Sequence, residues 1–184
     1  MQYLIPSLRL WLVTMVLCVI GYSALVLGFA QTVVPFRANG SIIETAGQAV
    51  GSELVAQEFT SPGYFWPRPS AAGYDAMGAM GSNLSPTSGA LAERAAETVA
   101  RYGATAGKPL PADLVAASGG GLDPHVSLAG ALYQVPRIAQ ARGVPASQIE
   151  RLVYAEVIVP NRVLSPDPIV NVLKLNLALD GLEE

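Results

Sequence analysis

The sequence is poor in the residues that build covalent cross-links and metal centres. Its 184 residues include one cysteine, Cys18, and one histidine, His125. A single cysteine cannot form a disulfide framework, and one histidine without a nearby cysteine cannot supply the usual three or four metal ligands. We therefore expect neither disulfides nor a metal site in this chain.

Basic residues are also scarce and scattered. From residue 31 onward, ten Lys and Arg residues face fourteen Asp and Glu residues, which gives a net charge of −4 with His125 neutral. An acidic domain without a Lys/Arg cluster binds nucleic acid poorly, and it lacks the polybasic run that holds proteins to anionic lipid. Nucleic acid is therefore excluded as the expected partner.

Charge is absent altogether from the segment Leu10–Ala30. Its twenty-one residues, at about 1.5 Å each in a helix, can cross a hydrocarbon core of roughly 30 Å. A cleaved signal peptide ending at Gly28-Phe29-Ala30 and a buried core helix are alternatives, but this apolar run is longer than either usually contains. We interpret 10–30 as an uncleaved transmembrane helix, 1–9 as a tail and 31–184 as one soluble domain.

The span also carries signals for orientation and packing. Arg9 and the terminal amine precede it, whereas Arg37 follows at some distance, so the positive-inside rule favours a cytoplasmic N-terminus. Gly21, Ala24 and Gly28 would let another helix approach closely, although small residues are common in spans generally. We predict that these three residues contact a partner helix.

Periodicity predicts a mixed domain after the span. Helices are expected at 41–59 after the capping box Ser41–Glu44, at 90–101, at 127–143 with a kink at Pro136, and after a second capping box, Ser147–Glu150. Strands are expected at 157–159 and at 172–179, where leucines alternate with other residues. The fold class is therefore a single N-terminal transmembrane helix plus an α/β or α+β soluble domain with a small sheet.

Residues 60–89 contain no helical or strand period and are rich in Gly, Pro, Ser and Asn. They also hold Tyr64, Phe65, Trp66 and Arg68, and aromatic residues and arginine are favoured at interfaces. A well-packed irregular loop and a contact surface are both compatible with this composition.

Two glycine-rich stretches are candidate anion sites. Gly103–Lys108 has three residues between its glycines and a proline after the lysine, so it fails as a phosphate loop and is interpreted as a turn. In Ser118–Gly121, consecutive glycines allow backbone N–H groups to converge on an anion. A Ser118, Asp123 and His125 triad would crowd all three members into one turn, so no catalytic residues are predicted.

Several ordered motifs together resemble one known family. Tyr64–Ser70 is similar to its Y-F-x-x-R-P-S segment, and Gly81–Thr87 is similar to G-S-N-L-x-P-T. The similarity continues in order through Asp113–Val115, Ala117–Gly119, Gly121–His125, Gln134-Val-x-Arg137, Ala141–Gly143 and Val170–Leu179. Over nearly its whole length the chain resembles the C subunit of the bacterial Kdp potassium-transporting ATPase.

This resemblance implies an accessory role in the bacterial inner membrane. In that complex a channel-like subunit selects potassium and a P-type subunit hydrolyses ATP, while the C subunit supports assembly and is proposed to raise ATP affinity as a catalytic chaperone. It implies that this chain is no enzyme by itself and binds no cofactor of its own, ATP and potassium belonging to the complex. The nucleotide-binding candidates are Ser118, Gly119, Gly120, Gly121, Gln134 and Arg137, and the subunit-contact candidates are Gly21, Ala24, Gly28, Tyr64, Phe65, Trp66, Arg68 and Asn83.

Two points oppose a simple transfer of that role. With a cytoplasmic N-terminus the domain is periplasmic, away from ATP, so direct ATP contact would require the opposite topology. The family often has Thr-Glu-Gly where this chain has Val157, Ile158 and Val159, and Arg where it has Ile169. The alternative is an independent, membrane-anchored periplasmic hydrolase or binding protein.

Overall fold

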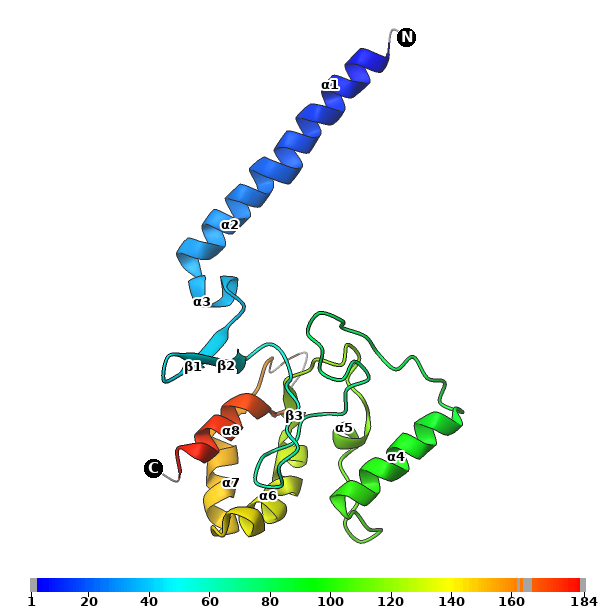
Figure 1. Cartoon of the computed structure of the whole chain (residues 1–184), viewed down its shortest axis with the longest axis vertical. Coiled ribbons are helices and arrows are strands. Elements are labelled where there is room, and N and C mark those ends of the chain that lie inside the picture. Colours follow the sequence, from blue (N-terminus) through cyan, green and yellow to red (C-terminus); the bar gives the residue numbers. More distant parts are fainter. Residues whose placement is uncertain (1–2, 162, 164–166, 183–184) are drawn as a thin grey trace. The chain divides into compact units, whose positions relative to one another are not determined.

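The computed structural model of the chain (Figure 1) describes residues 3–161, 163 and 167–182. It divides into two compact units, Met1–Ala49 and Val50–Glu184.

A long apolar helix makes up most of the first unit. α1 (Leu4–Met15), the π-helical segment η1 (Val16–Gly21) and α2 (Tyr22–Val33) join into one helix of 30 residues. This helix is long and apolar enough to cross a membrane, and it extends beyond both ends of the predicted span. The hydroxyls of Thr14 and Thr32 donate to carbonyls one turn earlier in the helix, at 3.0 and 2.9 Å. Both hydroxyl groups are therefore hydrogen-bonded within the helix itself.

A hairpin replaces the helix that the sequence predicted at 41–59. After the short α3 (Pro35–Ala38), strands β1 (Ile42–Thr45) and β2 (Gln48–Ser52) form a two-stranded sheet. Ala46 and Gly47 have φ angles of +52° and +77°, and positive φ at both central residues is typical of a type I′ hairpin turn. The helical prediction was wrong because this turn reverses the chain in the middle of the apparent four-residue spacing.

The second unit is built on a three-stranded antiparallel sheet. Its order is β3 (His125–Ser127), β5 (Ile169–Asn171) and β4 (Val157–Ile158). Val170 lies opposite Val126 on one side and Val157 on the other, and it is fully buried. The predicted strand at 157–159 is confirmed for its first two residues, and Ile158 lies opposite Ile169.

Three helices pack together around this sheet. α6 (Leu128–Arg142) contacts α7 (Ala146–Ala155) and strands β3 and β5, and α7 contacts α8 (Val172–Asp180). Figure 1 shows α6, α7 and α8 grouped together. The core of the unit is buried and apolar: it comprises Phe65, Leu114, Val126, Ala131, Val135, Ile138, Ile149, Val153, Val170, Val172, Leu175 and Leu179. The fold class is confirmed as one N-terminal apolar helix plus an α/β region with small antiparallel sheets.

α8 corrects the predicted strand at 172–179. The Asn171 side chain accepts a hydrogen bond from the Lys174 N–H at 3.1 Å and so caps a helix. Val172, Leu175, Asn176 and Leu179 are buried, which is the spacing of one helical face. The alternating leucines also fit the pattern of a strand, so the local sequence alone did not distinguish a helix from a strand here.

The remaining helices largely follow their sequence signals. α6 begins after Ser127, whose hydroxyl accepts from Gly130 N–H at 2.9 Å, and ends at Gly143 with φ +67°. It runs through the exposed Pro136 without a break. α4 (Gly89–Tyr102) confirms the helix predicted at 90–101, and α5 (Ala112–Val115) is one short turn. α7 starts after Pro145, so the second capping box was wrong although the helix exists.

Candidate functional site

Two buried amides hold the irregular segment that carries the aromatic residues. Asn176 accepts from the Phe65 N–H at 2.8 Å and donates to the Phe65 carbonyl at 3.0 Å. Gln134 accepts from the Trp66 N–H at 2.8 Å and donates to the Trp66 carbonyl at 3.1 Å. Because both amides are almost completely buried, each one replaces the hydrogen bonds that a neighbouring strand would otherwise supply.

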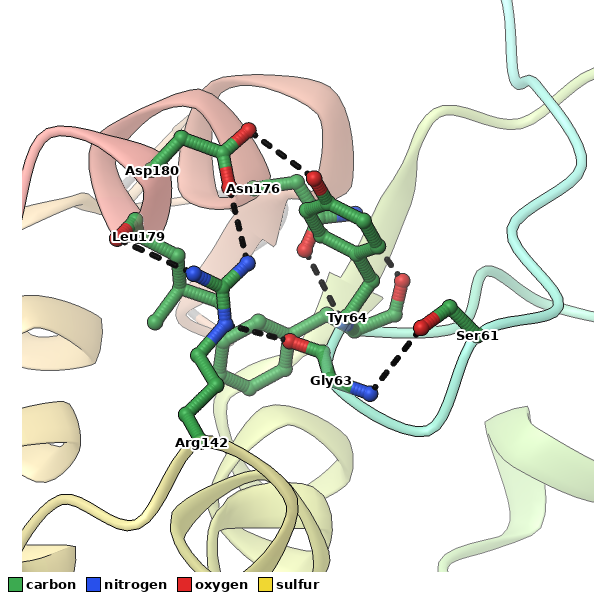
Figure 2. Close-up of polar contacts among 8 residues, drawn as sticks. Ser61, Gly63, Tyr64, Arg142, Asn176, Leu179 and Asp180 are labelled. Carbon is green, nitrogen blue, oxygen red and sulfur yellow. Dashed lines mark hydrogen bonds and ion pairs between the residues drawn. The ribbon is translucent and has the colours of Figure 1, made fainter. Parts of the chain in front are cut away.

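Arg142 and Asp180 fix the preceding residues (Figure 2). Arg142 Nε donates to the Gly63 carbonyl at 2.8 Å, and its Nη2 pairs with Asp180 Oδ1 at 2.8 Å. The Tyr64 hydroxyl donates to Asp180 Oδ2 at 3.1 Å. Burial, together with the hydrogen bond to Asp180, raises the pKa of Tyr64. The predicted contact residues Tyr64 and Phe65 are therefore held tightly within the domain.

Trp66 is the centre of a group of aromatic and basic side chains. The guanidinium carbons of Arg101 and Arg137 lie 4.0 and 3.7 Å from its ring centroid, and the Tyr102 ring meets it edge-on at 5.2 Å. Tyr133 adjoins Tyr102 at 6.2 Å, and Lys108 Nζ lies 4.7 Å from the Tyr133 ring centroid. We call this group the aromatic–cation cluster: Trp66, Arg101, Tyr102, Lys108, Tyr133 and Arg137.

The cluster borders a cavity of about 240 Å³ with a largely polar lining. The lining consists of Tyr102, Lys108, Tyr133, Gln134, Pro136, Arg137 and Gln140. Burial lowers the pKa of Arg137 to about 10, and burial raises the pKa of Tyr102 to about 12. At neutral pH Arg137 therefore stays charged and Tyr102 stays neutral, so the face is positively charged.

The glycine run lies elsewhere in the unit. The Ser118 N–H donates to the Pro69 carbonyl at 3.0 Å, and the Gly121 N–H donates to the Ser118 carbonyl at 3.2 Å. A Cβ on Gly121 would lie 2.8 Å from the Ala72 Cβ, so this glycine allows close packing against the 70–80 loop. Gly119 and Gly120 are exposed. The structure thus brings Gln134 and Arg137 to one cavity, whose lining includes none of the glycine run.

Arg68, Asp123 and His125 form a separate polar group. Arg68 Nη1 pairs with Asp123 Oδ2 at 2.9 Å, and the His125 N–H donates to Asp123 Oδ1 at 3.0 Å. His125 Nδ1 lies 3.5 Å from the same oxygen. Within the part of the chain that the structure describes, no hydrogen bond joins His125 to the buried Ser118, so the arrangement of a catalytic triad is not formed.

Comparison with known proteins supplies the family. The family model for the K⁺-transporting ATPase c chain, KdpC, matches residues 4–181. The chain belongs to the KdpC family. It is 57% identical to the potassium-transporting ATPase KdpC subunit of Parvibaculum lavamentivorans over 184 residues, covering 100% of this chain and 98% of that one. The corresponding subunit of Gemmatimonas aurantiaca is 50% identical over 191 residues, covering 99% and 94% of the two chains. The resemblance inferred from the ordered motifs is thereby confirmed.

The remaining candidates in this KdpC-family chain are exposed. Gly21, Ala24 and Gly28 lie on the surface of the long helix, and nothing lies within 4 Å of a Cβ built on Gly28. Asn83 is exposed in the irregular segment with φ +48°. Among the residues described, no group of three or more His, Cys, Asp or Glu side chains could hold a metal.

The sequence analysis named two members of the cluster, Trp66 and Arg137, together with Gln134 beside them, but it did not name the other four members as site residues. Arg101, Tyr102, Lys108 and Tyr133 belong to other segments and carry no local motif that joins them to Trp66. Their association depends on contacts across the chain, such as the two hydrogen bonds between Gln134 and Trp66, 68 positions apart.

Proposed function

We propose that this chain is the accessory subunit of an ATP-driven potassium importer. It assembles with a channel-like potassium-binding subunit and a P-type ATPase subunit, and it does not hydrolyse ATP itself. The observation that carries the proposal is the full-length match to KdpC subunits, because it includes both the long helix and the folded unit after it.

The long helix anchors the chain beside its partners. It carries no Asp, Glu, Lys, Arg or His from Leu10 to Ala30, so it offers no ion ligand or proton relay of its own. Gly21, Ala24 and Gly28 are exposed on the surface of this helix, and such small residues let helices approach closely in lipid. These features support a helix that binds another helix.

The folded unit supports the partners and, as a catalytic chaperone, raises the ATP affinity of the P-type subunit. Ser118, Gly119, Gly120, Gly121, Gln134 and Arg137 remain the proposed nucleotide contacts. Both polar atoms of the Gln134 amide already bind Trp66, whereas Gly119 and Gly120 have accessible backbone. The exposed glycines are therefore more available than Gln134 for contact with ATP. If the chain instead changes ATP affinity through the partner subunit, no contact with ATP is needed.

The proposed orientation places this unit in the periplasm. Its net charge of −4 from residue 31 onward would mildly favour potassium near the pore entrance. In this orientation the effect on ATP affinity must reach the cytoplasmic site through the partner subunits.

Affinity purification of the tagged full-length chain from potassium-starved cells, in mild detergent, tests the proposal. We expect the channel-like and ATPase subunits in a fixed ratio, and a lower Michaelis constant for ATP in complexes that contain the chain. Replacing Gly21, Ala24 and Gly28 together by Leu should reduce recovery, whereas Val19→Leu with Val26→Leu is the control for added bulk. Recovery of the chain alone, with both subunits expressed, would overturn the proposal and favour an independent anchored protein.

A further inference from the structure

The aromatic–cation cluster carries positive charge without a matching carboxylate. Three basic side chains in the described part of the chain form ion pairs with acids: Arg68 with Asp123, Arg142 with Asp180 and Lys174 with Glu53. Within that same part, no ion pair is formed by Arg101, Lys108 or Arg137.

Arg137 shows this imbalance most clearly. Its terminal nitrogens donate to neutral acceptors, the Pro62 carbonyl and Gln134 Oε1, and its buried Nε has no hydrogen-bond partner. Arg101 also lies against the indole ring of Trp66, so two like charges contact one ring. A carboxylate placed in the adjoining cavity would offset this repulsion.

The composition of the cluster matches the centre of a protein interface. Trp, Tyr and Arg are the residues that most often dominate binding energy there. Arg101 and Lys108 are exposed, so both charges are accessible, and they form a positive patch on an acidic chain. We propose that the aromatic–cation cluster receives an aspartate or glutamate side chain of a partner subunit. This inference rests on the proposed function, which supplies the partner.

A side-chain carboxylate suits the cavity better than a nucleotide does. The cavity, about 240 Å³, is smaller than the roughly 300–1,000 Å³ of typical small-molecule sites. Trp66 is only 7% exposed, and two guanidinium groups already lie against its ring, so a base cannot stack on it. The glycine run is not part of the cavity.

Carbodiimide cross-linking of the purified wild-type complex tests the contact directly. A carbodiimide joins a lysine amine to a carboxylate that touches it, forming an amide bond with loss of water as the carbodiimide becomes a urea. We expect mass spectrometry to find Lys108 joined to an Asp or Glu of a partner subunit. Lys108→Arg keeps the charge but lacks the amine, so complexes recovered with this variant should contain no adduct at residue 108.

Charge reversal supplies a second test. Arg101→Glu and Lys108→Glu should each lower partner recovery by about tenfold at low salt, and less at high salt. Arg151→Glu changes the net charge equally at an exposed arginine of α7 and should leave recovery unchanged. Thermal unfolding of each full-length variant in detergent verifies folding.

The outcomes separate this inference from the proposed function. If the wild-type chain recovers no subunits, the proposed function fails. If the wild-type complex forms without a Lys108 adduct and the reversal variants match Arg151→Glu, the carboxylate contact is wrong. Loss of ATP binding by the reversal variants with unchanged assembly would also overturn it, because it would assign the cluster to phosphate.

Discussion

Gln134 shows how a motif residue can serve the fold rather than a ligand. Its amide is 1% exposed, and both of its polar atoms bind the backbone of Trp66. Its Oε1 also accepts from Arg137 Nη2 at 2.7 Å. One buried side chain therefore fixes the positions of two members of the aromatic–cation cluster.

Replacing Gln134 by Ala should destabilise the folded unit by about 3 kcal/mol, because it leaves the buried N–H and C=O of Trp66 without partners. Gln140→Ala is the control on the same helix, at an exposed position, and should change stability by less than about 0.5 kcal/mol. Chemical unfolding of the full-length chain in detergent, followed by circular dichroism, measures both. Equal free energies of unfolding for the two variants would contradict the structural role of Gln134.

Asp123 should make stability depend on pH. Burial raises its pKa, but hydrogen bonds from His125 and Arg68 outweigh burial and hold the pKa below its usual value. A lowered folded-state pKa means that the carboxylate stabilises the fold above the unfolded-state pKa of about 4, and that this contribution disappears as the pH falls through the folded-state value. Asp123→Asn should therefore cost roughly 1 kcal/mol at pH 7 and much less at pH 3.

Thermal unfolding of the wild-type chain and this variant at both pH values checks the expectation. Glu150→Gln removes an exposed carboxylate on α7 and serves as the control. If the difference in stability between wild type and Asp123→Asn stayed constant from pH 7 to pH 3, the charged form of Asp123 would not be the cause of the stabilisation.

Among the helices and strands, α8 illustrates the limit of pattern reading. Its leucines at 173, 175, 177 and 179 alternate as in a strand, yet the three- and four-residue separations among Val172, Leu175, Asn176 and Leu179 place these residues on one helical face. Asn176 supplies the decisive contact, because it reaches the Phe65 backbone 111 residues away. No local signal in the sequence reports that contact.

Two leucines distinguish the helix from the predicted strand. A strand would bury Leu175 and Leu177 on the same face, whereas α8 buries Leu175 fully and Leu177 only in part. Leu175→Ala should therefore cost about 3 kcal/mol, and Leu177→Ala about 1 kcal/mol or less. Chemical unfolding of both full-length variants distinguishes the helix from the strand, because a strand would require similar losses of stability for the two substitutions.

The elements that the sequence predicted correctly have local causes. α4 and α6 follow from apolar spacing, and α6 also from its cap at Ser127 and its left-handed end at Gly143. The hairpin of β1 and β2 was missed because the positive φ of Ala46 is unusual for alanine. The candidate site was found only in part, since Trp66 and Gln134 belong to motifs whereas Arg101 and Lys108 do not.

At the scale of the whole molecule, the side of the membrane on which the second unit lies decides what that unit can do. Arg9, which precedes the uncharged segment Leu10–Ala30, favours a cytoplasmic N-terminus, and this orientation would separate the unit from ATP. A carboxylate contact through the aromatic–cation cluster is possible on either side. Direct contact of ATP with the glycine run is possible only in the cytoplasm.

Labelling of single cysteines would resolve the orientation. In a Cys18→Ser background, Met77→Cys places a thiol at a residue that is 95% exposed in the second unit, and Ser7→Cys places one before the apolar core of the long helix. In cells with an intact inner membrane, we expect a membrane-impermeant maleimide to label Met77→Cys, and to label Ser7→Cys only after lysis. The reverse pattern would place the second unit in the cytoplasm. It would make Gly119 and Gly120 accessible to ATP, and the proposed chaperone effect could then act by direct contact rather than through the partner subunits.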